Sequence, residues 1–423
     1  MYEKMTPMNR ILHLLFLSLA FQYARAQSIG IGTATPHASA LVQVSSTTQG
    51  ILAPRLSSAQ RNAIVNPATG LLVFQTDGEP GFCYYSGIAW INLTRGYALN
   101  DQGYSSNYGR VSTLAGGGGT AVTDGRGAAA TFNTAAGVAV DLSGNLYVAD
   151  AHNNKIRKIT VGGVVSTLAG SGVEGSADGV GTTASFNTPW GVAVDVSGNL
   201  YVADLNNNKI RKITAAGVVS TLAGSGAAGS LDGAGAAASF NGPYGIAVDI
   251  PGNVYVADAG NNEIRKITAG GMVSTLAGSA AAGFADGVGT AASFSGPYGI
   301  AVDIPGNVYV ADAGNAAIRK ITAGGLVTTL VNTGTAAPLY HPASIAVDAS
   351  GNLYISDLLG NTILKRTNAG VQTVLAGNGI GGYADGVGTE AFFYFPYGVA
   401  VDAAANVYVG DALNNAVRKI IAY

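Results

Sequence analysis

An aspartate recurs at a nearly fixed interval through the C-terminal part of the chain, and this repeat limits the fold more than any other feature. A fixed period of this length indicates an architecture in which similar units pack on their neighbours. The fold must therefore be built from six related units. The recurring residues are Asp150, Asp204, Asp258, Asp312, Asp357 and Asp411, in steps of 54, 54, 54, 45 and 54 residues.

Each unit contains four short runs of strand-forming residues, separated by turns of Gly, Asn and Asp. The third unit shows the pattern in full, as Gly245–Asp249, Gly252–Asp258, Ile264–Ile267 and Val273–Gly278. Four short strands per period are typical of a propeller blade, because each four-stranded sheet buries its faces against neighbouring blades. A parallel β-helix is the alternative, although its coils are shorter and rarely contain two hairpin turns. The sequence therefore predicts an all-β chain with a six-bladed β-propeller of four strands per blade.

The two ends of the array are incomplete in complementary ways. The last unit stops at Tyr423 without a fourth run, and an unattached run, Val111–Gly116, precedes the first unit. The N-terminal run is therefore expected to supply the outer strand of the last blade, which pairs two sheet edges that would otherwise be exposed. This arrangement closes the ring at six blades.

The repeated residues resemble a known family. The blocks Gly-Val/Ile-Ala-Val-Asp, Gly-Asn-Leu/Val-Tyr-Val-Ala-Asp and Asn-Asn-Lys-Ile-Arg-Lys-Ile are similar to NHL repeats, and the resemblance covers residues 111–423 six times over. The Asn-His-Leu letters that name the family are not kept here, because Asn153-Asn154-Lys155 and its counterparts stand in their place. The resemblance implies a six-bladed propeller.

The first residues have the features of an export signal. Lys4 and Arg10 precede an apolar run from Ile11 to about Phe21, and Ala24-Arg25-Ala26 offers a cleavage site of small residues. The apolar run is about half of the ~20 residues that span a bilayer, so a membrane anchor is the less favoured alternative. The protein is therefore expected to be secreted or held at the cell surface, with no transmembrane segment in the mature chain.

A separate segment lies between this signal and the repeats. Its apolar runs Leu71–Gln75 and Phe82–Tyr85 flank Asp77-Gly78, a pattern that predicts a β-hairpin. The segment is similar to N-terminal regions of surface and tail-fibre-like proteins of Bacteroidetes-type bacteria, which implies export and self-association. The expected organisation is a signal peptide (1–26), a small β-rich module (27–95), a linker (96–110) and the propeller (111–423).

Composition and residue spacing exclude several classes of function. The net charge is -2, the pI is near 6.1 and no lysine or arginine cluster is present, so nucleic acid is not expected as a partner. Cys83 is the only cysteine, which rules out an intramolecular disulfide. His152 and His341 lie in different blades without a second ligand at metal-binding spacing. We therefore predict no catalytic residue, no metal site and no cofactor, and we interpret the recurring aspartates as turn and strand-end residues.

A residue shared by every blade is explained by what every blade needs, so a binding site is sought among departures from the repeat. The residue just before the first strand is aromatic in four blades and alanine in the other two. The shorter fifth blade brings Tyr340 and His341 towards the same face. Two interpretations stay open: these aromatic rings pack the loops, or with Tyr340 and His341 they form a candidate ligand-binding rim for sugars or peptides. The residues before the first strands are Ala136, Trp190, Tyr244, Tyr298, Ala343 and Tyr397.

Together these patterns favour an exported binding scaffold that presents one propeller face to a protein or glycan, while the N-terminal module locates or multimerises it. Two alternatives stay open: an enzyme of the lactonase or lyase type that related propellers carry, and a purely structural cell-surface protein. An enzyme would need acidic or histidine side chains directed into the channel, where the first strands offer Val, Ile and Ala.

Overall fold

The chain forms two compact units, residues 1–97 with 101–103 and residues 98–100 with 104–423. The predicted signal peptide and most of the predicted linker lie outside the described residues. No helix in the described part of the chain is long and apolar enough to cross a membrane. The computed structural model describes residues 29–31, 42–44, 46–48, 50–78, 80–87, 89–93, 97–98, 108–332 and 337–422.

Among its described residues the first unit contains a two-stranded parallel sheet, a five-stranded sheet and one short helix. The helix α2 (Ser58–Asn62) begins with a capping box, in which the Ser57 side chain accepts from the Gln60 backbone and the Gln60 side chain accepts from the Ser57 backbone. Two central strands form the hairpin that the sequence predicts. The strands are β1 (Ile29–Ile31), β2 (Val42–Val44), β3 (Arg55–Leu56), β4 (Leu72–Gln75), β5 (Gly81–Tyr85), β6 (Trp90–Asn92) and β7 (Tyr97–Ala98).

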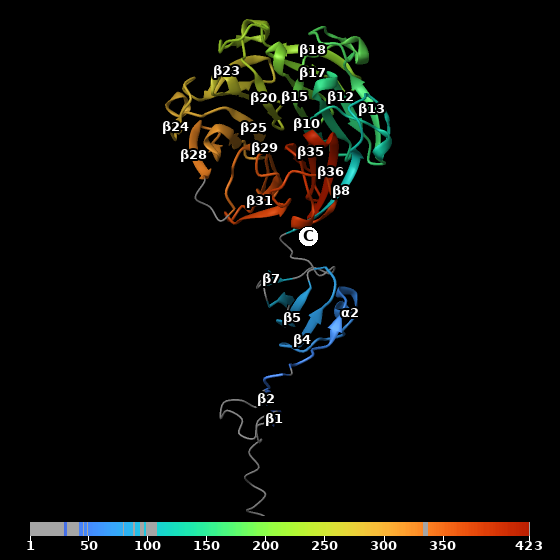
Figure 1. Ribbon diagram of the computed structural model, residues 1–423. Coiled ribbons are helices and arrows are strands. Elements are labelled where there is room, and N and C mark those ends of the chain that lie inside the picture. The colour runs from blue at the N-terminus through green and yellow to red at the C-terminus, as the bar shows by residue number, and fades with distance from the viewer. Residues whose placement is uncertain are drawn as a thin grey trace, which may run out of the picture. The chain divides into compact units, whose positions relative to one another are not determined.

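The second unit is a propeller of six sheets with four or five strands each. Figure 1 shows these blades arranged in a ring. This confirms the predicted all-β, six-bladed fold. Every blade has four main antiparallel strands in sequence order. The first of them lines the central channel, and the other three follow it outward. The first strands are β10 (Ala135–Val140), β15 (Pro189–Val194), β20 (Pro243–Val248), β25 (Pro297–Val302), β29 (Pro342–Val347) and β34 (Pro396–Val401). The second strands are β11 (Leu146–Asp150), β16 (Leu200–Asp204), β21 (Val254–Asp258), β26 (Val308–Asp312), β30 (Leu353–Asp357) and β35 (Asn406–Asp411).

The outer half of each blade follows the same order. The third strands are β12 (Lys155–Ile159), β17 (Lys209–Ile213), β22 (Glu263–Ile267), β27 (Ala317–Ile321), β31 (Thr362–Arg366) and β36 (Ala416–Ala422). The fourth strands are β13 (Val164–Ala169), β18 (Val218–Ala223), β23 (Met272–Ala277), β28 (Leu326–Val331), β32 (Gln372–Ala376) and β8 (Gly109–Gly116). Short 3-10 turns follow most second strands, namely η2 (Ala151–Asn153), η4 (Leu205–Asn207), η6 (Ala259–Asn261), η8 (Ala313–Asn315) and η10 (Ala412–Asn414).

The ring closes by pairing the two ends of the repeat array. Strand β8 is antiparallel to β36, with Gly109 opposite Ala422 and Gly116 opposite Ala416, which confirms the predicted N-terminal outer strand. In five blades a two-residue strand pairs with the fourth strand and covers part of the open edge. These strands are β9 (Gly125–Arg126), β14 (Gly179–Val180), β19 (Gly233–Ala234), β24 (Gly287–Val288) and β33 (Gly386–Val387), each followed by η1 (Gly127–Ala129), η3 (Gly181–Thr183), η5 (Gly235–Ala237), η7 (Gly289–Ala291) or η9 (Gly388–Glu390).

The apolar core lies between blades rather than within one sheet. Tyr147 and Ala149 of the first blade pack against Phe186, Val202 and Ile213, which belong to the second. Since each blade face is covered only by its neighbours, the closed ring is what completes the core. Five of the clusters contain a fully buried phenylalanine before the first strand, and the fifth blade has Leu339 there; the phenylalanines are Phe132, Phe186, Phe240, Phe294 and Phe393.

A buried arginine links two strands and a loop in five of the six blades. In the third blade, Arg265 Nη1 donates to Asp258 at 3.0 Å and Nη2 donates to Asp232 at 2.7 Å. The same nitrogens donate to the carbonyls of Ser239 and Leu231, each at 3.0 Å. Arg265 and Asp258 have no exposed side-chain surface. The strand-end aspartate therefore has a structural role. The equivalent arginines are Arg157, Arg211, Arg319 and Arg418.

The aspartate after the first strand orders the next turn. In the first blade, Asp141 Oδ1 accepts from the backbone N–H groups of Ser143 (2.9 Å) and Asn145 (2.8 Å). Its Oδ2 accepts from the Tyr147 hydroxyl at 3.1 Å. Burial, followed by the charge of Asp141, raises the pKa of Tyr147 to about 12. This aspartate is a turn residue, as the sequence indicates.

Replacing Arg265 by leucine tests the buried pair. Leucine is what the fifth blade has at this position, as Leu364. The variant is expected to lower the free energy of unfolding by about 3–5 kcal/mol, because Asp258 would stay buried without its cation. Urea-induced unfolding followed by circular dichroism measures the loss. The double variant Arg265→Leu with Asp258→Asn should recover part of it, and an equal loss in both variants would contradict this account.

Alkaline pH should destabilise the propeller. Burial and the neighbouring aspartate favour the neutral phenol in the folded state, so this stabilisation is complete below the ordinary tyrosine pKa of about 10 and is lost as the pH rises to about 12. The melting temperature should fall across this window, and Tyr255→Phe should make the fall shallower. A melting temperature that stays constant up to pH ~12 would contradict the raised pKa of these tyrosines. Tyrosines with a pKa raised to about 12 by burial and an aspartate are Tyr147, Tyr201, Tyr255, Tyr309 and Tyr408.

Candidate functional site

A β-bulge at the start of the first strands directs their second residue to one mouth of the channel. The register shifts between Pro189 and Val192 in β15 and between Pro243 and Ile246 in β20. A bulge bends its strand locally and re-aims the side chain it carries. The side chains placed in this way are Trp190, Tyr244, Tyr298 and Tyr397, with Ala136 and Ala343 in the other two blades.

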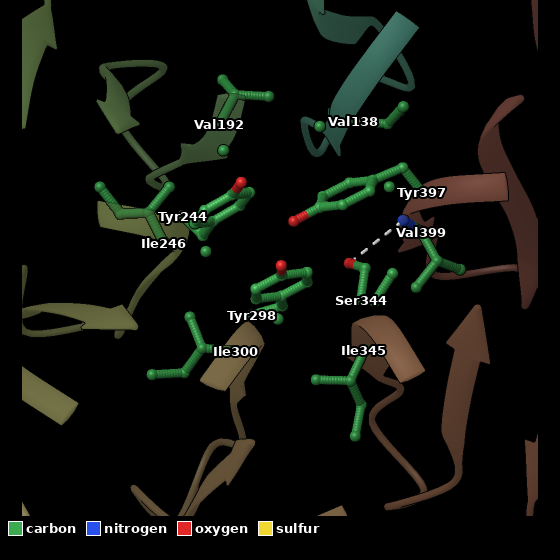
Figure 2. A pocket seen from close by; sticks show the side chains of 16 residues that line it. Val138, Val192, Tyr244, Ile246, Tyr298, Ile300, Ser344, Ile345, Tyr397 and Val399 are labelled. Atoms are coloured by element: carbon green, nitrogen blue, oxygen red, sulfur yellow. Dashed lines mark hydrogen bonds between the residues drawn. The ribbon is translucent and has the colours of Figure 1, made fainter. Parts of the chain in front are cut away.

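The residue after each of these side chains is small because neighbouring first strands approach closely there. A Cβ atom on Gly191 would overlap the carbonyl oxygen of Tyr244, and one on Gly245 would overlap that of Tyr298. The fifth blade has Ser344 instead, whose Oγ accepts from the Val399 backbone at 3.3 Å (Figure 2). The close contact of the strands narrows the channel just below the aromatic residues.

Five of the six predicted site residues come together in one cluster, the aromatic cap, made of Trp190, Tyr244, Tyr298, His341 and Tyr397. Tyr244 and Tyr298 are stacked, with ring centroids 4.5 Å apart and an interplanar angle of 9°. Trp190 meets Tyr397 edge-on at 5.0 Å, and Tyr298 meets His341 at 5.2 Å. Figure 2 shows the hydroxyls of Tyr244, Tyr298 and Tyr397 turned towards one another. The rings therefore pack on each other across the channel mouth.

The cap also buries polar atoms. Tyr397 is only 6% exposed, and within the described residues its hydroxyl, Trp190 Nε1 and His341 Nδ1 have no hydrogen-bond partner. Burial raises the pKa of Tyr397 well above its usual value and, with Tyr298 beside it, raises that of Tyr244 to about 12. Burial lowers the pKa of His341, against the opposing charge of Asp357. Burial in the cap therefore favours the neutral forms of Tyr244, His341 and Tyr397.

The space beneath the cap is small. A cavity of about 50 Å³ lies under the tyrosines, which is room for a few water molecules. Towards the other mouth the channel holds a second space of about 180 Å³, with walls of Val, Ile and Ala from all six first strands. Ligand pockets usually measure about 300–1,000 Å³, so a sugar ring does not fit under the closed cap. In the described ranges no group of three or more His, Cys, Asp or Glu side chains is arranged to hold a metal ion.

Tyr340, the sixth predicted residue, is not among the ring contacts of the cap and is 64% exposed. Its backbone N–H donates to Asp357 at 2.8 Å, and the N–H of His341 donates to the same carboxylate at 2.8 Å. Asp357 is the strand-end aspartate of the fifth blade, where Leu364 replaces the arginine. The bond from the Tyr340 N–H has a counterpart in every other blade, such as Asn241 N–H to Asp258. What the fifth blade has in place of the ion pair are the bonds from the His341 and Gly360 N–H groups.

Three more exposed apolar residues lie on the loops of this face, and sequence reasoning missed all three. Leu359 is 54% exposed, Tyr394 42% and Leu413 48%. The backbone N–H of Leu413 donates to the carbonyl of Tyr394 at 3.1 Å, so these two loops are in contact. With Tyr340 they make up the apolar arc of blades five and six.

Hydrogen bonds join the loops of the apolar arc into one surface. The Leu358 N–H donates to the carbonyl of His341 at 3.0 Å, which connects the Tyr340 loop to the turn that carries Leu359. The Phe395 N–H donates to Asn361 Oδ1 at 3.0 Å, which connects this turn to the Tyr394 loop of the next blade. The four exposed side chains thus lie on adjoining, mutually bonded loops.

The apolar arc is a departure from the repeat. Aligning the loops blade by blade would have revealed it, because Tyr340 and Tyr394 replace small polar residues and Leu359 and Leu413 replace residues that are mostly polar or glycine. The counterparts of the tyrosines are Asn133, Asn187, Asn241 and Ser295. The counterparts of the leucines are His152, Asn206, Gly260 and Gly314.

Comparison with protein families places known sequence types on both units. Residues 132–159 and 186–213 match the NHL repeat, and residues 30–107 match a family described as a phage tail like trimerisation region. The chain thus carries NHL repeats on a β-propeller, preceded by a phage-tail-like region, which confirms the resemblance drawn from the sequence.

Similar proteins extend the comparison. SUPPRESSOR OF QUENCHING 1, a chloroplastic protein of Arabidopsis thaliana, is 30% identical over 190 residues, which are 42% of this chain and 18% of that protein. The chain spans less than a fifth of the length of the curated relatives that it matches.

Two solved structures share the fold. An auxiliary nutrient binding protein from Bacteroides thetaiotaomicron is 16% identical, with a TM-score of 0.56 over 83% of this chain and 87% of that one. A gluconolactonase from Xanthomonas campestris is 15% identical, with a TM-score of 0.52 over 84% and 98%. At these identities the likeness shows the fold alone.

Two substitutions separate the packing of the Tyr397 ring from the chemistry of its hydroxyl. Tyr397→Ala is expected to lower the free energy of unfolding by about 3–5 kcal/mol, because it empties the centre of the cap. Tyr397→Phe keeps the ring and removes a buried hydroxyl without a partner, so it should leave stability unchanged or raise it. Urea-induced unfolding compares the two. A loss of more than ~1.5 kcal/mol in the phenylalanine variant would contradict this, since it would mean that the hydroxyl is hydrogen-bonded.

Proposed function

We propose that this NHL-repeat propeller, with its phage-tail-like N-terminal region, is an exported binding scaffold that holds a protein or glycan on the channel-mouth face of blades five and six. The apolar arc is the observation that carries the proposal. Tyr340 and Leu359 are more than half exposed, and Tyr394 and Leu413 nearly so. Contiguous exposed apolar side chains on a soluble surface mark interaction sites.

The arc has the chemistry of a recognition surface. Tyrosine supplies a large apolar face and a polar hydroxyl at a low entropic cost, which suits stacking on sugar rings and packing on peptide side chains. The blades without these residues keep the same fold, so the propeller itself does not require them. Tyr340 and Tyr394 are therefore explained better by a ligand than by folding.

The aromatic cap gives this surface a rigid base. Its rings fill the channel mouth, and the small cavity beneath keeps a ligand on the outside of the propeller. The half-buried edges of Trp190, Tyr244 and Tyr298 extend the ligand-binding rim inward from Tyr340 and His341. Residues of the rim can therefore serve both purposes: Tyr340 in the arc contacts the ligand, and the residues of the cap support that surface.

A binding role is supported in one more way. A propeller of the same fold is an auxiliary nutrient binding protein, and the signal-like first residues support export. The alternative hypothesis, a lactonase-type enzyme, is also supported by a fold neighbour. It would need polar groups in the channel, whose walls are Val, Ile and Ala. We therefore favour binding over catalysis.

Glycan and peptide arrays probed with the purified chain test the proposal. Saturable binding is expected for the native chain. Tyr340→Ser with Leu359→Ser should weaken it at least ~30-fold, because central contact residues contribute about 2 kcal/mol or more each. The matched control is Asn187→Ser with Asn206→Ser, which changes the same two positions in the second blade and should bind normally.

A second pair of substitutions tests whether the cap residues Trp190 and Tyr244 contact the ligand. Trp190→Ala with Tyr244→Ala should weaken binding less than the arc variant, provided that circular dichroism shows a folded propeller. Native binding that is unaffected by the arc variant would contradict the proposed surface. No saturable binding to any glycan or peptide would favour a purely structural protein.

A further inference from the structure

A cavity of about 300 Å³ lies between the fourth and fifth blades, at the opposite end of the strands from the aromatic cap. One wall is the turn from β25 to β26, with Asp303, Ile304 and Pro305, and another is the turn from β29 to β30, with Ala349 and Ser350. The loops that carry the cap and the apolar arc lie at the other end of the same strands. We call this space the inter-blade pocket, and its volume reaches the usual range of small-molecule sites.

The lining of the inter-blade pocket departs from the repeat in the fifth blade. Ala349 and Ser350 stand where the third and fourth blades have isoleucine and proline. Asn368, in the turn from β31 to β32, stands where the first four blades have alanine or valine. The smaller turn leaves more room beside Ile304, and the asparagine adds an amide to the wall. The polar lining of this pocket is therefore not required by the fold of a blade.

The pocket contains a cation that no carboxylate neutralises. The ammonium of Lys320 lies over the Tyr309 ring at 5.5 Å, and it forms no ion pair or hydrogen bond with any described residue. Lys320 is half-buried, so its side chain is held against the pocket wall. An ammonium group has three hydrogen-bond donors, and here they are available to a ligand.

One carboxylate of the pocket has a free acceptor position. Asp303 accepts from the Asn307 backbone at 2.7 Å, from the Asn307 side chain at 2.8 Å and from the Tyr309 hydroxyl at 3.0 Å. The equivalent aspartate of the fifth blade accepts a further bond from the backbone N–H of Ser350. In the fourth blade Pro305 stands at that position and has no N–H to donate. Since a carboxylate has about four acceptor positions, one on Asp303 is open to a ligand.

We propose that the inter-blade pocket binds one unit of a neutral sugar. Its donors are the Lys320 ammonium, the Ser350 hydroxyl and the Asn368 amide, and the Asp303 carboxylate is an acceptor. The side chains of Ser350 and Asn368 form no hydrogen bond within the described part of the chain. Each hydroxyl of a sugar both donates and accepts, so neighbouring hydroxyls match this mixture of groups.

The other walls of the pocket favour a neutral ring over a charged ligand. Ile304 and Pro305 form an apolar wall on which the C–H groups of a sugar ring can pack, as in sites that combine apolar walls with a few polar groups. Two carboxylates, Asp303 and Asp348, lie against one ammonium, so an anionic ligand would meet net repulsion. The pocket is on the other face from the apolar arc, so this site stands or falls separately from the proposed function.

Saturation-transfer NMR of the purified full chain with free glucose, galactose and mannose tests the pocket. At least one of these sugars should bind saturably, with a Kd of about 1 mM or tighter. Lys320→Met keeps a long side chain over Tyr309 and removes the ammonium. It should weaken binding at least ~10-fold, because a hydrogen bond to a charged group contributes about that factor or more. The matched control is Lys266→Met, which makes the same change between the third and fourth blades and should bind normally.

A second variant fills the pocket instead of removing a charge. Ala349→Ile with Ser350→Pro gives the fifth blade the turn that the fourth blade already has, and it should abolish binding. Circular dichroism shows whether each variant is folded, and the folded one decides if the other is not.

Three results would overturn the proposal. The first is no saturation by any of the three sugars, and the second is saturation that persists in the folded pocket variants or falls equally in Lys266→Met. The third comes from the arc variant, Tyr340→Ser with Leu359→Ser. Sugar binding that is lost there and kept in the pocket variants would place the sugar at the channel mouth.

Discussion

The buried arginine that five of the six blades share is the interaction on which the propeller depends. A guanidinium without exposed surface is tolerated only when its hydrogen bonds and its charge are nearly all satisfied, because removing a charge from water costs several kcal/mol. In the third blade Arg265 meets this condition with two carboxylates and two backbone carbonyls, drawn from the second strand and from the loop that precedes the blade. One side chain thereby orders two strands and a connection at the same time.

The fifth blade shows what happens when this interaction is absent. Leu364 stands in the arginine position, and the buried Asp357 accepts from the backbone N–H groups of His341 and Gly360 in addition to that of Tyr340, whose counterparts bond to this aspartate in the other blades. The loop carries an exposed tyrosine next to a member of the aromatic cap. The blade that departs from the structural repeat thus also departs from it on the surface, which is where a single binding site in a repeat protein is expected.

The two units cover their apolar surfaces in different ways. The propeller completes its core by closing on itself, through the pairing of β8 with β36. The five-stranded sheet of the N-terminal unit buries one face under α2, while Phe82 on its other face is 39% exposed. The two units therefore complete their cores by different means, the propeller by closing the ring and the N-terminal sheet by a covering helix.

Much of this was readable from the sequence. The spacing of the strand-end aspartates determined the blade count, and the stray run Val111–Gly116 determined how the ring closes, because both depend on local strand pattern and on pairing that must leave no exposed edge. The aromatic residues Trp190 and Tyr244 were also predicted as site residues, because the local strand pattern aligns them with alanines in two other blades. Only the tertiary structure decided that these rings pack into a cap and that Tyr394 and Leu413 share a surface with Tyr340. The direction of a side chain at a bulge and the contact between loops of different blades are set by how sheets stack, and no short-range pattern in the chain contains that information.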